Sequence, residues 1–180
     1  DRQQLETKIA AEVLDFFVHH LDRIGVVKKI ALLLYTRGGD TLAAWSIANL
    51  LRSFCDHLEV IVPSKCHSAG TLICLGADTI LMTKQATLGP IDPSVNTPLN
   101  PQLPGGQPMA KVPVNVEDVN AFLEYAKNSL GGNAELGAVF DRLAQAVHPI
   151  VLGNAFRARS QIRMLGRRLL GSHIKDEEPI

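Results

Sequence analysis

The chain has 180 residues, of which 46% are hydrophobic and 20% charged, a composition typical of a soluble globular domain with one core. Eighteen basic and eighteen acidic side chains cancel, which excludes a global electrostatic attraction to nucleic acid or to an anionic membrane. The three cysteines lack CxxC spacing, so a disulfide framework and a structural zinc site are also excluded, and we expect no metal and no cofactor.

Localisation is predicted from the absence of two kinds of segment. The sequence contains no uninterrupted apolar run of about 18–20 residues, as a membrane span needs, and no signal peptide. Together with the reduced cysteines, this favours a cytoplasmic protein. The abrupt ends, "DRQQLETK" and "KDEEPI", favour a fragment of a longer chain. Membrane association through segments outside this chain stays open.

The first half of the sequence, about residues 1–90, predicts an α/β core. Apolar residues at helical spacing predict an amphipathic first helix, and a continuous apolar run, "KKIALLLYT", predicts a strand covered on both faces. Strands then alternate with helices, which implies right-handed crossovers and a mainly parallel sheet. The expected helices are 4–23, 41–54 (capped by Asp40 or Thr41) and 68–78, and the expected strands are 28–36, 58–64 and 79–83.

The second half changes character. Residues 89–108 are rich in proline, glycine and asparagine and predict a long irregular loop, extending to about 110. Three helical patterns follow at 115–130, 133–147 and 150–171, so that 111–171 forms a helical part of the same single domain. The last helix is basic, and we expect it to dock on the core or a neighbouring subunit with its arginines in water.

The stretch "TRGGDTLAAW" places Gly38 and Gly39 between a strand and a helix. Consecutive glycines let another molecule approach the main chain closely. The spacing is neither that of a GxxxxGK[ST] loop nor that of a GxGxxG turn, and Asp40 would repel a phosphate. Nucleotide binding is therefore not expected.

The stretch "VPSKCHSAGTL" places Ser68 where a strand meets a helix. Ser68 can be an ordinary helix cap, or it can be a nucleophile at the positive end of the helix, beside the small residues Ala69 and Gly70 that leave room for a substrate carbonyl. Adjacent parallel strands bring such loops to one edge of the sheet. The N–H groups of Gly39 and Ala69 could then form an oxyanion hole beside the Ser68 hydroxyl.

Three blocks, "LLLYTRGGDTLAAWSIANLLR", "VIVPSKCHSAGTLICLGADTILM" and "ATLGPIDPS", resemble the Clp protease/crotonase superfamily. The resemblance spans roughly residues 5–130. Within the superfamily the sequence is most similar to serine dehydrogenase proteinases, relatives of signal peptide peptidase A. The resemblance implies a core of stacked ββα units and a serine peptidase acting on a peptide or protein substrate. It further implies a homo-oligomer, Ser68 as the nucleophile, and Gly39 and Ala69 as the oxyanion donors.

The resemblance also implies which residue is the general base. The Clp protease histidine falls here at Asp92-Pro93, so a Ser-His-Asp triad of that kind is absent. Signal peptide peptidases instead use a lysine, whose neutral amine can accept the serine proton. Between Ser68 and the C-terminal helices the candidates are Lys84 and Lys111. Lys84 is expected to be a solvated surface charge. Lys111 matches the position of the dyad lysine in the archaeal relatives and is preferred.

The remaining site residues are predicted to bind substrate: Gly38, His67, Gly70, Pro90 and Asp92. His67 is adjacent to Ser68 in sequence, so we expect it to form the wall of the pocket rather than to act as the base. Two alternatives stay open. One is a crotonase-like enzyme acting on an acyl thioester, which would leave Ser68 without a role. The other is a catalytically degenerate scaffold that binds a partner.

Overall fold

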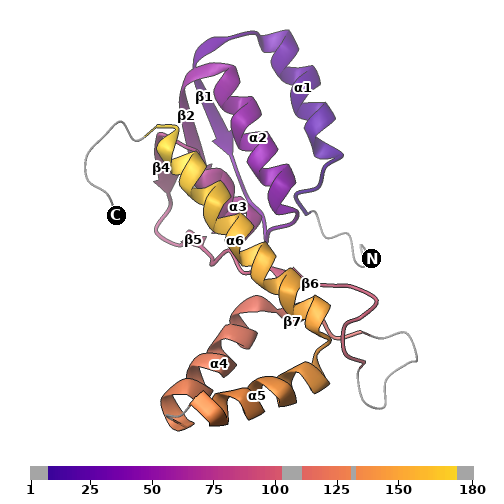
Figure 1. The fold of residues 1–180 in the computed structure, drawn as a ribbon. Helices are drawn as coiled ribbons and strands as arrows, with labels where there is room; N and C mark the ends of the chain where they lie inside the picture. The colour runs from indigo at the N-terminus through magenta and orange to yellow at the C-terminus, as the bar shows by residue number, and fades with distance from the viewer. Residues whose placement is uncertain (1–7, 103–110, 131–132, 174–180) are drawn as a thin grey trace, which may run out of the picture. The chain divides into compact units, whose positions relative to one another are not determined.

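The computed structural model describes residues 8–102, 111–130 and 133–173 (Figure 1). It divides into two compact units, described separately below. The first unit consists of two segments, one that ends at Ile91 and one that begins at Ile162. The second unit runs from Asp92 to Gln161. The start of the predicted first helix and residues 103–110 of the predicted loop lie outside the described residues.

The first unit is built on a parallel sheet of three strands. The strands β1 (Val27–Leu33), β2 (Cys55–Val62) and β4 (Thr79–Met82) lie side by side in that order. All pairings are parallel, with Leu33 opposite Ile61 and Ile61 opposite Leu81. The mainly parallel sheet predicted from the sequence is therefore confirmed.

Short strands follow the long ones. After β2 comes β3 (Lys65–Cys66), and after β4 comes β5 (Thr87–Leu88), and these two pair in parallel. Thr36, after β1, forms a parallel bridge with Cys66, so the same pattern recurs at the first strand. The helices α2 (Thr41–Ser53) and α3 (Ala69–Cys74) complete two ββα units. This is the stacking expected of a Clp protease/crotonase-like core.

Helices cover one face of this sheet. Leu58, Val60 and Val62 of β2 are fully buried on that face. They join one hydrophobic cluster with residues of α1 (Val13–Ile24), α2, α3 and the last turns of α6 (Pro149–Gly171) (Figure 1). The side chains from α6 are Leu165 and Leu169. The basic last helix thus docks through its apolar residues, as predicted, and Arg163, Arg167 and Arg168 are exposed. Arg159 differs from the prediction, because it is half-buried and pairs with Glu117 at 3.3 Å.

The expectation that the first strand is covered on both faces is wrong within the described residues. Exposure alternates along β1, and the side chain of Leu33 is 69% exposed. Its neighbours across the sheet are Ile61, which is half-buried, and Leu81, which is 47% exposed. A continuous apolar run indicates a strand, but the run alone does not say that both faces are covered within one chain.

The first helix begins later than predicted. Residue Ile9 pairs through its main chain with the Gly38–Asp40 segment instead of continuing the helical periodicity. Its N–H donates to Gly38 O at 2.9 Å, and its carbonyl accepts the Asp40 N–H at 2.7 Å. Tertiary hydrogen bonding therefore overrides the helical pattern before Val13.

The second unit is mainly helical. It contains α4 (Val116–Leu130), α5 (Asn133–Ala146) and the first half of α6, which confirms the three predicted helices. A small core of Val95, Val114, Val116, Val151 and Ala155 holds it together. The predicted loop is partly regular, because β6 (Ser94–Val95) pairs antiparallel with β7 (Val114–Asn115). Among the described residues, no helix has the length and apolar character that crossing a bilayer requires.

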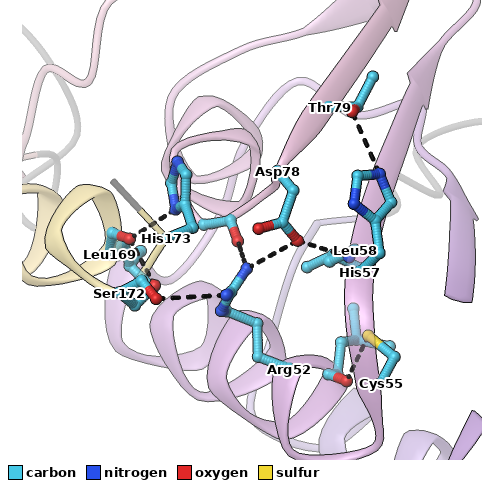
Figure 2. Close-up of polar contacts among 11 residues, drawn as sticks. Arg52, Cys55, His57, Leu58, Asp78, Thr79, Leu169, Ser172 and His173 are labelled. Carbon is cyan, nitrogen blue, oxygen red and sulfur yellow. Dashed lines mark hydrogen bonds and ion pairs between the residues drawn. The ribbon is translucent and has the colours of Figure 1, made fainter. Parts of the chain in front are cut away.

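A polar cluster around Arg52 ties together the end of the first unit that carries the C-terminal turn of α6 (Figure 2). The guanidinium donates to Gly76 O at 2.9 Å, to Asp78 Oδ2 at 3.1 Å and to Ser172 O at 3.3 Å. The same Asp78 oxygen accepts the Leu58 N–H at 2.7 Å. Burial alone would raise the pKa of Asp78, but the Leu58 N–H and Arg52 together outweigh it and lower that pKa.

The Arg52–Asp78 cluster makes a prediction about stability. Because the pKa of Asp78 is lowered in the folded state, its carboxylate stabilises the fold above its unfolded pKa, about 3.9, and this contribution is lost as the pH falls below that value. Asp78→Asn should therefore lower the free energy of unfolding by about 1–3 kcal/mol at neutral pH. The difference in the free energy of unfolding between Asp78→Asn and the parent should become smaller as the solution is acidified.

Urea unfolding of the parent, Asp78→Asn and the exposed control Asp56→Asn at a series of pH values measures this. A deficit for Asp78→Asn that is the same at acidic and neutral pH would contradict the role given to the carboxylate.

Candidate functional site

The Gly38–Gly39 turn lies between two segments of main chain. Both glycines have positive φ, 123° and 146°, which side-chain-bearing residues rarely adopt. A Cβ on Gly39 would collide with the main chain of Ile9, and a Cβ on Gly38 would lie 2.8 Å from the Cβ of Ser68 and 3.3 Å from its Oγ. The structure thus brings Gly38 and Ser68 into direct contact, and only glycine fits the turn.

Thr36 fixes this turn, and the sequence analysis missed it. Its buried Oγ1 accepts the Gly38 N–H at 3.0 Å and donates to Gly38 O at 3.2 Å. Its own main chain bonds on both sides of Cys66, since its N–H donates to Lys65 O at 2.9 Å and its carbonyl accepts the His67 N–H at 3.1 Å. The only sequence signal was a small hydroxyl residue two positions before the glycines.

Ser68 has a strained backbone. Its φ is 52° and its ψ is −116°, and it is the one non-glycine residue with positive φ in the described parts of the chain. Such a conformation costs about 1–3 kcal/mol and is characteristic of functional turns. The interpretation of Ser68 as an ordinary helix cap is wrong, because its side chain makes no capping hydrogen bond. Its half-buried hydroxyl therefore has no structural task at the start of α3.

Two backbone N–H groups, one in the Gly38–Gly39 turn and one at the start of α3, are unpaired in the part of the chain that the structure describes. Within the described residues, neither the Gly39 N–H nor the Ala69 N–H has a hydrogen-bond acceptor. Gly38 O and Asp40 N face Ile9, so the N–H of Gly39, between them, points away from that segment. Ala69 is the first residue of α3, where N–H groups have no partner inside the helix. Free donors of this kind can stabilise a negatively charged oxygen.

Three other predicted residues belong to the first unit. The ring of His67 packs on Gly89, and its Nε2 is 2.9 Å from Thr87 Oγ1. Gly70 is buried, with its α-carbon against the Thr36 methyl group and the Cys66 sulfur. Pro90 is exposed and follows Gly89, whose carbonyl accepts the Thr71 hydroxyl at 2.7 Å. The substrate-binding roles of these residues stay predictions.

Lys111 and Asp92 belong to the second unit. Lys111 is half-buried and bridges Gln102 through its main chain, and Asp92 Oδ2 accepts a hydrogen bond from the Asn115 side chain at 2.6 Å. The other candidate base, Lys84, is exposed in the turn after β4, in the first unit. The described residues contain no group of three or more metal-ligating side chains.

Asn100 organises the segment that carries Lys111, and it too was missed from the sequence. Its buried side chain donates to Val95 O at 2.6 Å and to Val112 O at 2.9 Å. Its Oδ1 accepts from the N–H and the hydroxyl of Thr97, at 2.9 Å and 2.8 Å. A single side chain therefore ties both ends of the loop together, one residue away from Lys111.

Comparisons with known proteins bear on the first unit most directly. Residues 22–105 match the family described as ClpP-like SDH-type serine proteinase, so the resemblance found in the sequence is confirmed over that segment. The segment contains both the Gly38–Gly39 turn and Ser68.

Two curated relatives come from Methanocaldococcus jannaschii and are described as uncharacterized. MJ0137 is 47% identical over 68 residues, covering 38% of this chain and 24% of the relative, and MJ1495 is 42% identical over 66 residues, covering 37% and 23%. The matched segments span about a quarter of either relative's length. Among solved structures, a mutant of the 1510-N membrane-bound stomatin-specific protease is similar, with 21% identity and a TM-score of 0.41. That similarity covers 69% of this chain and 59% of that chain.

The role of Thr36 can be tested with two substitutions of different chemistry. Thr36→Val keeps the shape and the methyl group on Gly70 but removes the hydroxyl that holds Gly38, whereas Thr36→Ser keeps the hydroxyl. We expect the Gly38 amide to exchange with solvent at least about fivefold faster in the valine variant, because one hydrogen bond contributes about 1 kcal/mol or more. Amide hydrogen exchange by NMR measures this. Equal protection of Gly38 in the parent and in Thr36→Val would contradict the assignment.

The role of Asn100 predicts a large loss of stability in the second unit. Asn100→Ala leaves two carbonyls, one N–H and one hydroxyl without this partner, which should cost about 2–4 kcal/mol. The exposed neighbour Asn96 offers a matched control, since Asn96→Ala should cost about 0.5 kcal/mol or less. Denaturant unfolding, combined with hydrogen exchange of residues 95–102, provides the measurement. Similar behaviour of the two variants would rule out the organising role.

Proposed function

We propose that this chain is a serine peptidase that hydrolyses peptide bonds through an acyl-enzyme on Ser68. The observation that carries the proposal is the backbone of Ser68, which is strained, lies at a strand-to-helix turn and leaves the hydroxyl out of any helix cap. The same arrangement presents the nucleophile in other hydrolases, where a sharp turn exposes the oxygen. The match of residues 22–105 to a family of serine proteinases supports the same reaction class.

The N–H groups of Gly39 and Ala69 are proposed as the oxyanion hole. When the Ser68 oxygen attacks a peptide carbonyl, negative charge develops on the carbonyl oxygen. Support comes from the two unpaired donors and from the contact of Gly38 with Ser68. Donors that the fold has already fixed need no reorganisation during the reaction.

Lys111 is proposed as the general base. In its neutral form the amine would take the Ser68 proton and later deliver it to the leaving amine of the substrate. Its half-buried position and the Asn100 network next to it support this role, whereas Lys84 is exposed. No step in this scheme requires a metal ion or a cofactor.

The substrate is proposed to be an extended peptide lying along Gly38 and the segment that contains Pro90 and Asp92. Glycine at position 38 leaves the main chain accessible next to the nucleophile. His67, held by Thr87, would form a wall of the cleft.

Labelling with a fluorophosphonate, which reacts with activated serines, tests the proposal. We expect the parent to be labelled, Ser68→Ala to lose all labelling, and Lys111→Ala to be labelled about 100-fold or more slowly, as expected when a general base is removed. The labelling rates of the variants are compared between about pH 6 and about pH 10.

Two further variants test whether Lys111 acts as a base or only supplies a positive charge. Lys111→Arg keeps the positive charge but cannot act as a base at these pH values, so it should be as slow as Lys111→Ala. Lys84→Ala should label at the parent rate. Loss of labelling in Ser68→Ala alone would keep the hydrolase and reject Lys111. A folded parent that does not label would reject the peptidase and favour the scaffold.

A further inference from the structure

Two thiols that the proposed reaction does not use lie side by side, one before and one after Ser68 in the sequence. Cys66 is the last residue of β3, and Cys74 is the last residue of α3. Their sulfurs are 3.6 Å apart, and the two residues are 0% and 1% exposed. A disulfide bond is about 2.05 Å long, so a shift of about 1.5 Å would join them.

The short segment between these cysteines contains the proposed machinery. Ser68 and Ala69 lie within it, and the main chain of Cys66 is bonded to the Gly89 N–H and the Thr71 hydroxyl. The Cys66 sulfur also packs against the α-carbon of Gly70. A shift of that sulfur changes its packing against Gly70, the second residue of α3, next to Ala69.

We propose that Cys66 and Cys74 are a redox modification site: a reversible disulfide between them displaces the start of α3 and inactivates Ser68. The inactivation rests on the proposed function, whereas the bridge itself does not. The oxidant is a peroxide. The Cys66 thiolate attacks one peroxide oxygen, forming a sulfenic acid and releasing hydroxide, and the Cys74 thiolate then attacks that sulfur and expels a second hydroxide. With the two thiol protons, two thiols and one hydrogen peroxide give one disulfide and two waters.

The environment of the pair suits this order of events. The contact with the Cys74 thiol lowers the pKa of Cys66, against the effect of burial, so Cys66 is the thiol that ionises first. The contact with Cys66, followed by burial, raises the pKa of Cys74. Because both sulfurs are buried, peroxide reaches them through local opening of α3, a helix of only six residues.

The test treats the folded chain with hydrogen peroxide and then alkylates its free thiols under denaturing conditions. Peptide mass spectrometry should find Cys66 joined to Cys74, with Cys55 alkylated. Hydrogen exchange should change across residues 67–75, and Ser68 labelling should fall at least about tenfold, because small misplacements of catalytic groups cost about that much or more. Dithiothreitol should reverse all three changes.

Variants and controls keep the outcomes distinct. The Cys74→Ala variant cannot form the bridge, so peroxide should leave its hydrogen exchange unchanged. Cys55→Ala should behave as the parent, because the Cys55 thiol, at the start of β2, donates to Leu51 O. Cys66 and Cys74 that remain free to alkylate after peroxide treatment would overturn the proposal. A bridge that changes neither exchange nor labelling would overturn it as well. A reduced parent that never labels would reject the peptidase, while mass mapping and exchange would still decide the bridge and its effect on α3.

Discussion

The main chain of Gly38 is fixed from three sides, and the proposed site depends on this constraint. The Thr36 hydroxyl bonds to both its N–H and its carbonyl, Ile9 donates to the same carbonyl, and Ser68 lies against its α-carbon. The main chain of Thr36 is in turn bonded to Lys65 and His67, on either side of Cys66. These bonds join the segment after β1 to the segment after β2. The proposed nucleophile and the proposed oxyanion donors thereby lie in segments that are held by main-chain hydrogen bonds and by the hydroxyl of Thr36.

The strain at Ser68 is tolerated because its neighbours are held independently. The His67 N–H donates to Thr36 O and the Gly70 N–H donates to His67 O, at 3.1 Å and 2.9 Å. These bonds fix the chain on each side of Ser68 and oppose its relaxation to an ordinary backbone conformation, which would recover about 1–3 kcal/mol. The apolar cluster beneath α2 and α3 holds both segments against the sheet. Core packing is therefore linked directly to the geometry of the hydroxyl.

Sequence patterns predicted the parallel sheet and the helices of the second half, and they left Asp40 or Thr41 as the cap of α2. The structure shows Asp40, whose carboxylate accepts the Ala43 N–H at 2.7 Å. These features arise from local periodicity and local hydrogen bonds. The late start of α1 and the roles of Thr36 and Asn100 were missed, because each depends on partners far away in the sequence. The uncovered face of β1 was missed because an apolar run does not say what lies on each side of a strand. Ser68 was placed at the strand-to-helix turn, but its positive φ and its missing cap hydrogen bond could not be predicted from the sequence.

The central claim is that the fold itself makes Ser68 reactive. The most direct measurement is the site and extent of phosphonylation in the folded chain and in the same chain unfolded in urea, determined by peptide mapping after equal exposure to the probe. We expect modification at Ser68 in the folded chain and none in urea, because the strained turn and the two open N–H groups are brought together only in the native structure. Absence of modification at Ser68 in the folded chain, or equal modification in both states, would contradict it.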